Sequence, residues 1–142
     1  MYVYANPNPL GLDTGDCVIR ALSILLNQSW DKIYTDLCLT GYSMGMMPST
    51  NAVHQQFLKQ YGYKMQLLPS NCPNCITVKE FSELYPKGRY FLATGDHVVA
   101  LIDGTFYDIF DSSNDTVVYY YSKKGESTAH LWRIIHNYTS PM

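Results

Sequence analysis

The chain has 142 residues, of which 46% are hydrophobic and 15% are charged, and its formal net charge is −2. This length fits one domain with one core, and the composition is that of a globular rather than a disordered protein. The small negative charge excludes the basic balance typical of nucleic-acid-binding proteins. No apolar run approaches the ~20 residues of a membrane span. We therefore expect one globular domain over 1–142, with neither nucleic-acid nor membrane partners.

The four cysteines are Cys17, Cys38, Cys72 and Cys75. The opening residues do not show the charged segment and apolar segment of a secretory signal. We therefore expect a cytoplasmic protein, in which reduced thiols are the default state.

Helical spacing begins after the turn-rich stretch that ends at Gly15. Val18, Leu22 and Leu25 recur at intervals that place them on one helix face. Thr14 or Asp16 can cap this helix. Cys17 then falls in its first turn.

Three more helices are predicted before residue 90. The second begins after Ser29 and stops near Gly41, and the third runs from about 50 to Gly62. The stretch 77–80 carries a capping-box pattern for a short fourth helix that ends by Pro86.

The hydrophobic period then changes from helical to alternating. The segments "YKMQLL", "RYFLAT", "HVVALI", "TFYDIF" and "TVVYYYS" are predicted strands, and "AHLWRIIHNY" at 129–138 is interpreted as a final strand rather than a helix. The expected fold class is α+β, with N-terminal helices packed on a C-terminal antiparallel sheet.

Cys17 is the candidate nucleophile. The thiolate is the reactive form of cysteine, and its pKa falls at a helix N-terminus and beside a basic partner. Unpaired backbone N–H groups in that first turn can also stabilise an oxyanion.

His97 is the best candidate base, because it opens a strand after the turn residues Gly95-Asp96 and so lies at the rim of the sheet. The loop of the following hairpin decides its partner. A three-residue loop places Asp111 opposite His97, whereas a two-residue loop places Phe110 opposite it and Asp108 diagonally across. Asp111 is favoured because it lies at the rim, and Asp108 is the alternative.

The quoted stretches "GDCVIRALS" and "GDHVVALIDGTFYDIFDS" resemble papain-like cysteine peptidases. The closest likeness is to NlpC/P60-like and C39-like enzymes and to small papain-like proteins of bacteriophages and bacteria. The resemblance implies a single papain-like domain with Cys17 as nucleophile, His97 as base and Asp111 orienting the imidazole. Papain-like enzymes often carry an oxyanion-binding glutamine about six residues before the cysteine, where this chain has Gly11. Asn6 or Asn8, or the backbone N–H of Asp16 or Cys17, is the substitute.

Cys72 and Cys75 are spaced as in metal and redox sites, but the sequence shows no second close pair of ligands. Structural thiols are therefore preferred, with metal binding, or a redox or disulfide use, as alternatives. No metal or other cofactor is predicted.

The predicted function is cysteine-dependent hydrolysis or acyl transfer at an amide or related carbonyl of a protein or peptide. The alternative is a papain-fold binding module of the phage type, which captures a host protein or small ligand without turnover. In that case the compartment would be the host cytoplasm.

Overall fold

The computed structural model describes residues 1–69 and 71–123. In this part the chain forms a mixed α/β structure with a six-stranded sheet in the order β1-β5-β4-β3-β6-β2. Its strands are β1 (Tyr2–Tyr4), β2 (Tyr63–Leu67), β3 (Arg89–Thr94), β4 (Val98–Ile102), β5 (Thr105–Asp108) and β6 (Val117–Lys123). Its helices are α1 (Cys17–Leu26), α2 (Trp30–Met44), α3 (Asn51–Gln60) and α4 (Val78–Leu84).

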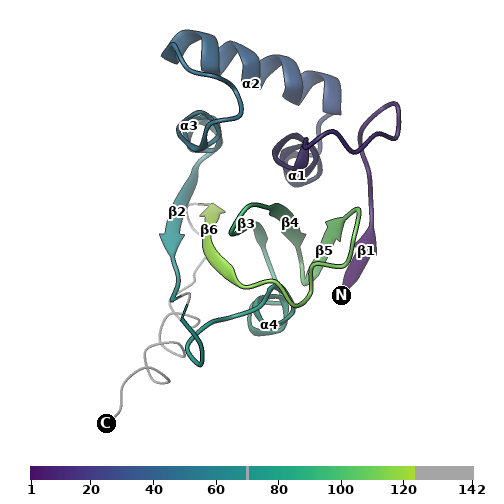
Figure 1. The fold of residues 1–142 in the computed structure, drawn as a ribbon, viewed down its shortest axis with the longest axis vertical. Helices are drawn as coiled ribbons and strands as arrows, with labels where there is room; N and C mark the ends of the chain where they lie inside the picture. The colour runs from purple at the N-terminus through teal and green to yellow at the C-terminus, as the bar shows by residue number, and fades with distance from the viewer. Residues whose placement is uncertain (70, 124–142) are drawn as a thin grey trace.

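The sheet is covered on both faces, as Figure 1 shows. Helices α1 and α3 lie against one face with α2 outside them, and α4 lies against the other. Alternation along β3 explains this arrangement, because Phe91 and Ala93 join the core beneath α1 and α3 whereas Tyr90 and Leu92 join the core beneath α4. The central strands therefore need to be apolar on both faces.

The expectation of a purely antiparallel sheet is wrong at one edge. Residues 2–4, where no strand was predicted, pair in parallel with β5. The other pairs are antiparallel, and β2 joins the opposite edge through β6. The predicted strand at 129–138 lies outside the described residues.

Helix ends follow the sequence signals in part. Ser29 caps α2 through its side chain, and the reciprocal bonds of Thr77 and Glu80 begin α4. The predicted end of α2 at Gly41 is wrong, since the helix continues to Met44 and ends at Gly45 in a left-handed conformation. Close packing requires a glycine at position 41, because a Cβ there would lie 2.7 Å from the Met46 carbonyl oxygen.

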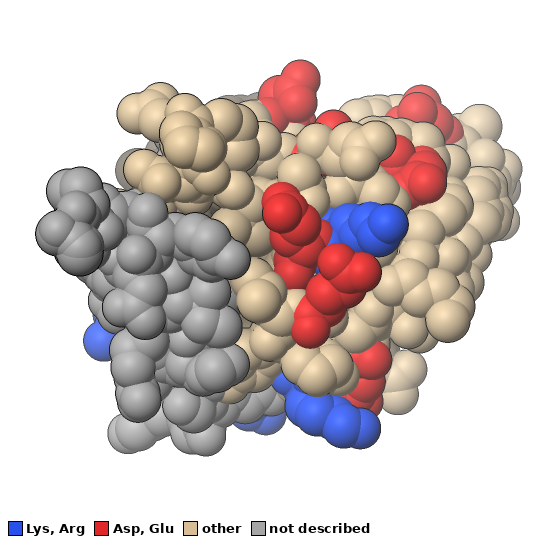
Figure 2. Space-filling view, turned by 90° about the horizontal axis from the view of Figure 1, so that it is seen from below, with Lys and Arg blue, Asp and Glu red and all other residues tan. Residues whose placement is uncertain are grey.

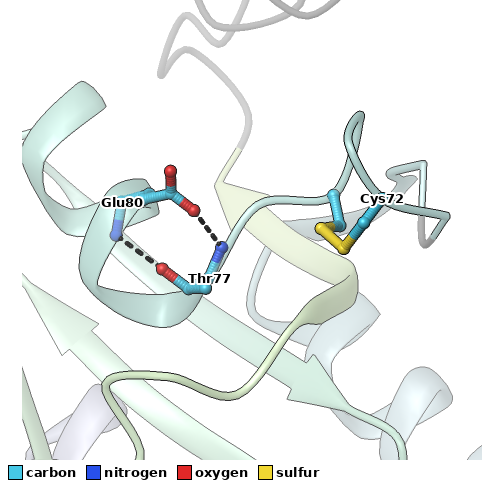
Figure 3. Close-up of a disulfide and its surroundings, with 4 residues drawn as sticks. Cys72, Thr77 and Glu80 are labelled. Atoms are coloured by element: carbon cyan, nitrogen blue, oxygen red, sulfur yellow. Dashed lines mark hydrogen bonds between the residues drawn. A yellow bond between two sulfur atoms is a disulfide. The ribbon is translucent and has the colours of Figure 1, made fainter.

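Cys72 and Cys75 form a disulfide on the loop that leads into α4 (Figure 3). The expectation of reduced thiols is therefore wrong for this pair. The described residues hold no group of three or more His, Cys, Asp or Glu side chains placed to bind a metal ion.

Charged residues on the face drawn in Figure 2 are mixed in sign. Basic side chains there lie among acidic ones and among many uncharged residues, so the described part of this face has no continuous basic surface. Within the described residues, no helix combines the length and the apolar character that crossing a bilayer requires.

Candidate active site

Cys17 is the first residue of α1, as the sequence predicts, and it is partly buried. As the first helical residue, its backbone N–H has no carbonyl four residues earlier within the helix to bond. The side chain of His97 and the backbone N–H of Val98 lie close enough to its thiol to lower the pKa of that thiol as hydrogen-bonding partners. The nucleophile candidate and the base candidate, 80 residues apart in sequence, therefore lie together in one pocket.

The pKa of Cys17 is lowered from its ordinary value of 9.0. Burial by itself raises the pKa of a thiol, because it disfavours the thiolate. The hydrogen bonds from His97 and from the Val98 N–H, together with the positive charges of His97 and Arg20, outweigh that effect. The site therefore favours the thiolate.

His97 is placed by the tight turn between β3 and β4. Its carbonyl oxygen accepts hydrogen bonds from the Thr94 backbone N–H at 2.8 Å and from the Thr94 hydroxyl at 3.2 Å. The ring of Phe110 packs against the imidazole with 4.7 Å between ring centroids. The histidine is thus held at the rim of the sheet by its own backbone and by an aromatic neighbour.

Asp108, the last residue of β5, is the carboxylate that meets His97. Its Oδ2 lies 2.6 Å from Nε2 of His97 and also accepts a hydrogen bond from the Ser112 hydroxyl at 3.1 Å. Its Oδ1 accepts from the Ile109 backbone N–H at 2.8 Å. Because an ionised carboxylate only accepts, Nε2 carries the proton of this bond and Nδ1 is the nitrogen left for Cys17.

The pKa of His97 is raised from 6.5 to about 9. Burial alone would lower the pKa of this histidine, but its hydrogen bonds and charge interactions with Asp108 and Cys17 are stronger in sum. The imidazolium therefore persists through neutral pH, opposite a thiol whose pKa is lowered.

The prediction that Asp111 orients His97 is wrong. Asp111 bonds the backbone and hydroxyl of Ser113 instead. The hairpin loop is the reason, since Ile102 pairs with Thr105 and only Asp103 and Gly104 lie between them. Both have positive φ, of 49° and 81°, as the favoured two-residue hairpin turn requires. The register therefore follows the two-residue alternative, which brings Asp108 and Phe110 to His97.

Most of the predicted oxyanion donors bond other groups. The side-chain amide of Asn6 donates to the Leu12 carbonyl at 3.3 Å, and Asn6 is not among the described residues that line the pocket at Cys17. The prediction for Asp16 concerned its backbone N–H, which bonds the carboxylate of the same residue. The side-chain amide of Asn8 donates to that carboxylate as well. The backbone N–H of Cys17 is then the remaining candidate of the predicted set.

Asp16 organises the start of α1 rather than the chemistry. Its buried carboxylate accepts from Asn8 Nδ2 at 3.1 Å and from Trp30 Nε1 at 2.8 Å, and it forms an ion pair with Arg20. These bonds lower the pKa of Asp16 although burial opposes them. The N-terminal loop, α1 and α2 are thus fastened together beside Cys17.

A pocket of about 420 Å³ opens over Cys17 and His97. Apolar side chains from α1, α2 and the sheet form most of its wall, among them Val18, Leu37 and Ala93. His54 of α3 also lines it, and sequence analysis missed this residue as part of the site. The sequence did carry a signal that His54 faces inward, because His54 lies three and four residues before the inward-facing Phe57 and Leu58 and so shares their helix face.

Comparison with known proteins adds no relative. No protein-family model matches the chain, no curated protein matches it, and no solved structure matches it.

Proposed function

We propose that this protein is a cysteine-dependent hydrolase or acyl transferase of papain-like type, with Cys17 as nucleophile, His97 as acid and base, and Asp108 orienting the imidazole. The observation that carries the proposal is the continuous series of interactions from the Cys17 thiol, whose pKa His97 lowers, through His97 to the buried carboxylate of Asp108. Nucleophile, base and orienting group in mutual contact are the arrangement that covalent catalysis requires.

The reaction follows from the protonation states. The Cys17 thiolate attacks the carbonyl carbon of an amide or ester, and the carbonyl electrons move to the oxygen, which the Cys17 backbone N–H stabilises. The imidazolium of His97 gives its Nδ1 proton to the leaving amine or alcohol as the bond to carbon breaks, which leaves a thioester. A water or acceptor amine then attacks the thioester, His97 takes the proton, and the Cys17 thiolate leaves.

Reaction of the protein with p-nitrophenyl acetate tests this proposal, because the experiment does not require the natural substrate to be known. We expect a burst of nitrophenol, a Cys17-acetyl intermediate visible by intact-protein mass spectrometry, and its subsequent loss to water. The Cys17→Ala variant should lose both phases. The matched control is Cys38→Ala, which removes the other free thiol in the same pocket and should keep both phases.

The competing function is ligand capture without turnover. An acetyl group that forms on Cys17 no faster than on Cys38, or one that forms and never hydrolyses, would favour this second function and contradict the first.

A further inference from the structure

His54 is a buried polar residue without a polar partner. It is 2% exposed, and neither Nδ1 nor Nε2 has a hydrogen-bond partner among the described residues. Its ring does contact Phe91, with 5.7 Å between ring centroids. A buried donor or acceptor without a partner lowers stability, and native proteins rarely retain one without a reason.

The place of His54 supplies such a reason. It lines the same pocket as Cys17 and His97, from the opposite helix α3. The volume of about 420 Å³ is within the ordinary range of ligand sites, which combine apolar walls with a few polar groups that fix orientation. Both nitrogens are closed to solvent in this structure, so a polar group of a bound molecule becomes their partner when the imidazole turns toward the pocket.

The chemistry of this partner follows from the protonation of His54. Burial lowers the pKa of its imidazole, so the ring is neutral at neutral pH and offers one N–H donor and one acceptor nitrogen. A hydroxyl or a carboxamide matches that pair. An ammonium group only donates and a carboxylate only accepts, so neither matches both nitrogens of His54.

We infer that the pocket is a substrate subsite in which His54 selects an apolar group that ends in an uncharged hydroxyl or carboxamide. This inference rests on the proposed function, because it concerns the part of the substrate next to the carbonyl that Cys17 attacks. His54 is a specificity-determining residue here and takes no part in the proton transfers.

A pair of thiol-reactive probes that differ by one oxygen tests the selection. The probes are N-(4-hydroxyphenethyl)iodoacetamide and N-phenethyl-iodoacetamide, and the measurement is the rate at which each alkylates Cys17. We expect the hydroxyl probe to react about 10-fold faster with the wild-type protein, since the phenyl probe leaves His54 unpaired. Equal rates would overturn the inference.

Two variants separate selection from folding. His54→Phe retains a planar ring but has no polar atom, so it should abolish the preference for the hydroxyl probe while the melting temperature is kept or increased. His54→Gln keeps a donor and an acceptor and should keep part of the preference. A fall in melting temperature for His54→Phe, with the probe preference unchanged, would identify His54 as a structural residue only.

Iodoacetamide itself distinguishes the two proposals. Fast alkylation of Cys17 with no discrimination between the larger probes contradicts only the role of His54. Should iodoacetamide react with Cys17 no faster than with Cys38, the proposed function fails, and binding then decides the subsite. In the Cys17→Ala variant, N-acetyltyramine should shift the imidazole ¹⁵N resonances of His54 and N-acetylphenethylamine should not; no shift with either ligand would overturn the subsite.

Discussion

Two buried aspartates flank the candidate active site, and they differ in the partner that each one meets. The side chains of Asp16 and Asp108 are 4% and 3% exposed. Asp16 is paired with Arg20, whose guanidinium is charged at every accessible pH. Asp108 is paired with His97, whose charge changes near neutral pH in ordinary surroundings. A carboxylate that is paired with a permanently charged arginine has a structural role. A carboxylate that is paired with a histidine is coupled to the gain and loss of the histidine proton.

The two aspartates also differ in what they join. The Asp16 carboxylate joins the N-terminal loop, α1 and α2, through Asn8, Arg20 and Trp30. Within the described residues, the carboxylate of Asp108 bonds His97 and its near neighbours Ile109 and Ser112. We therefore expect removal of Asp16 to act on stability and removal of Asp108 to act on the ionisation of Cys17.

The largest expected effect is that of Asp16→Ala on stability. The substitution leaves the buried Arg20 guanidinium with the distant, exposed carboxylate of Asp13 at 3.6 Å as its remaining ion-pair partner. Breaking a buried ion pair from one side costs about 3–5 kcal/mol of the free energy of unfolding. Urea denaturation measures this loss.

Two control variants sharpen the Asp16 result. Asp13→Ala removes the exposed partner of the same arginine and should cost less than about 1 kcal/mol. The double variant Asp16→Ala/Arg20→Met should recover part of the loss, because no unpaired cation then remains buried. Equal costs for Asp13→Ala and Asp16→Ala would contradict the structural role given to Asp16.

The next effect is that of Asp108→Asn on thiol reactivity. Without the carboxylate charge, burial dominates and the pKa of His97 falls from about 9, so the imidazolium no longer supports the thiolate in mildly acidic solution. We expect iodoacetamide alkylation of Cys17 at about pH 6 to slow by about 10- to 100-fold, tenfold for each unit of pKa.

The pH dependence checks the cause of that change. In the wild-type protein the lowered pKa of Cys17 keeps the thiolate present on the acidic side of its ordinary value of 9.0. In Asp108→Asn the thiol should ionise only as the pH rises toward that value, and the two proteins should converge above about pH 9. A deficit of the same size at every pH would instead point to a distorted site.

The smallest effect is expected for Asp111→Asn, the matched control for Asp108→Asn. Asp111 bonds Ser113 and does not meet His97. In the Asp111→Asn variant, the rate at which iodoacetamide alkylates Cys17 at about pH 6 should stay within about twofold of the wild-type rate, as expected for a surface substitution. A larger loss at Asp111 than at Asp108 would reverse the assignment of the histidine partner.

Local sequence determined the elements that carry the site. The helical period after Gly15 predicted that Cys17 lies in the first turn of a helix. The turn residues before His97 predicted a strand opened by His97, and the structure begins that strand one residue later, at Val98. The capping box at Thr77 and Glu80 is confirmed by both of its hydrogen bonds. Such features follow from neighbours in the chain, which is why the sequence is sufficient to predict them.

Only the tertiary structure decided which groups meet. One residue more or less in the hairpin loop exchanges Asp108 for Asp111 at His97, and the sequence was compatible with both loops. The parallel pairing of β1, the disulfide between Cys72 and Cys75, and the position of His54 in the pocket depend likewise on contacts between distant segments. Propensity and periodicity are local quantities, whereas register and the partner of a buried polar group are set by packing across the whole chain.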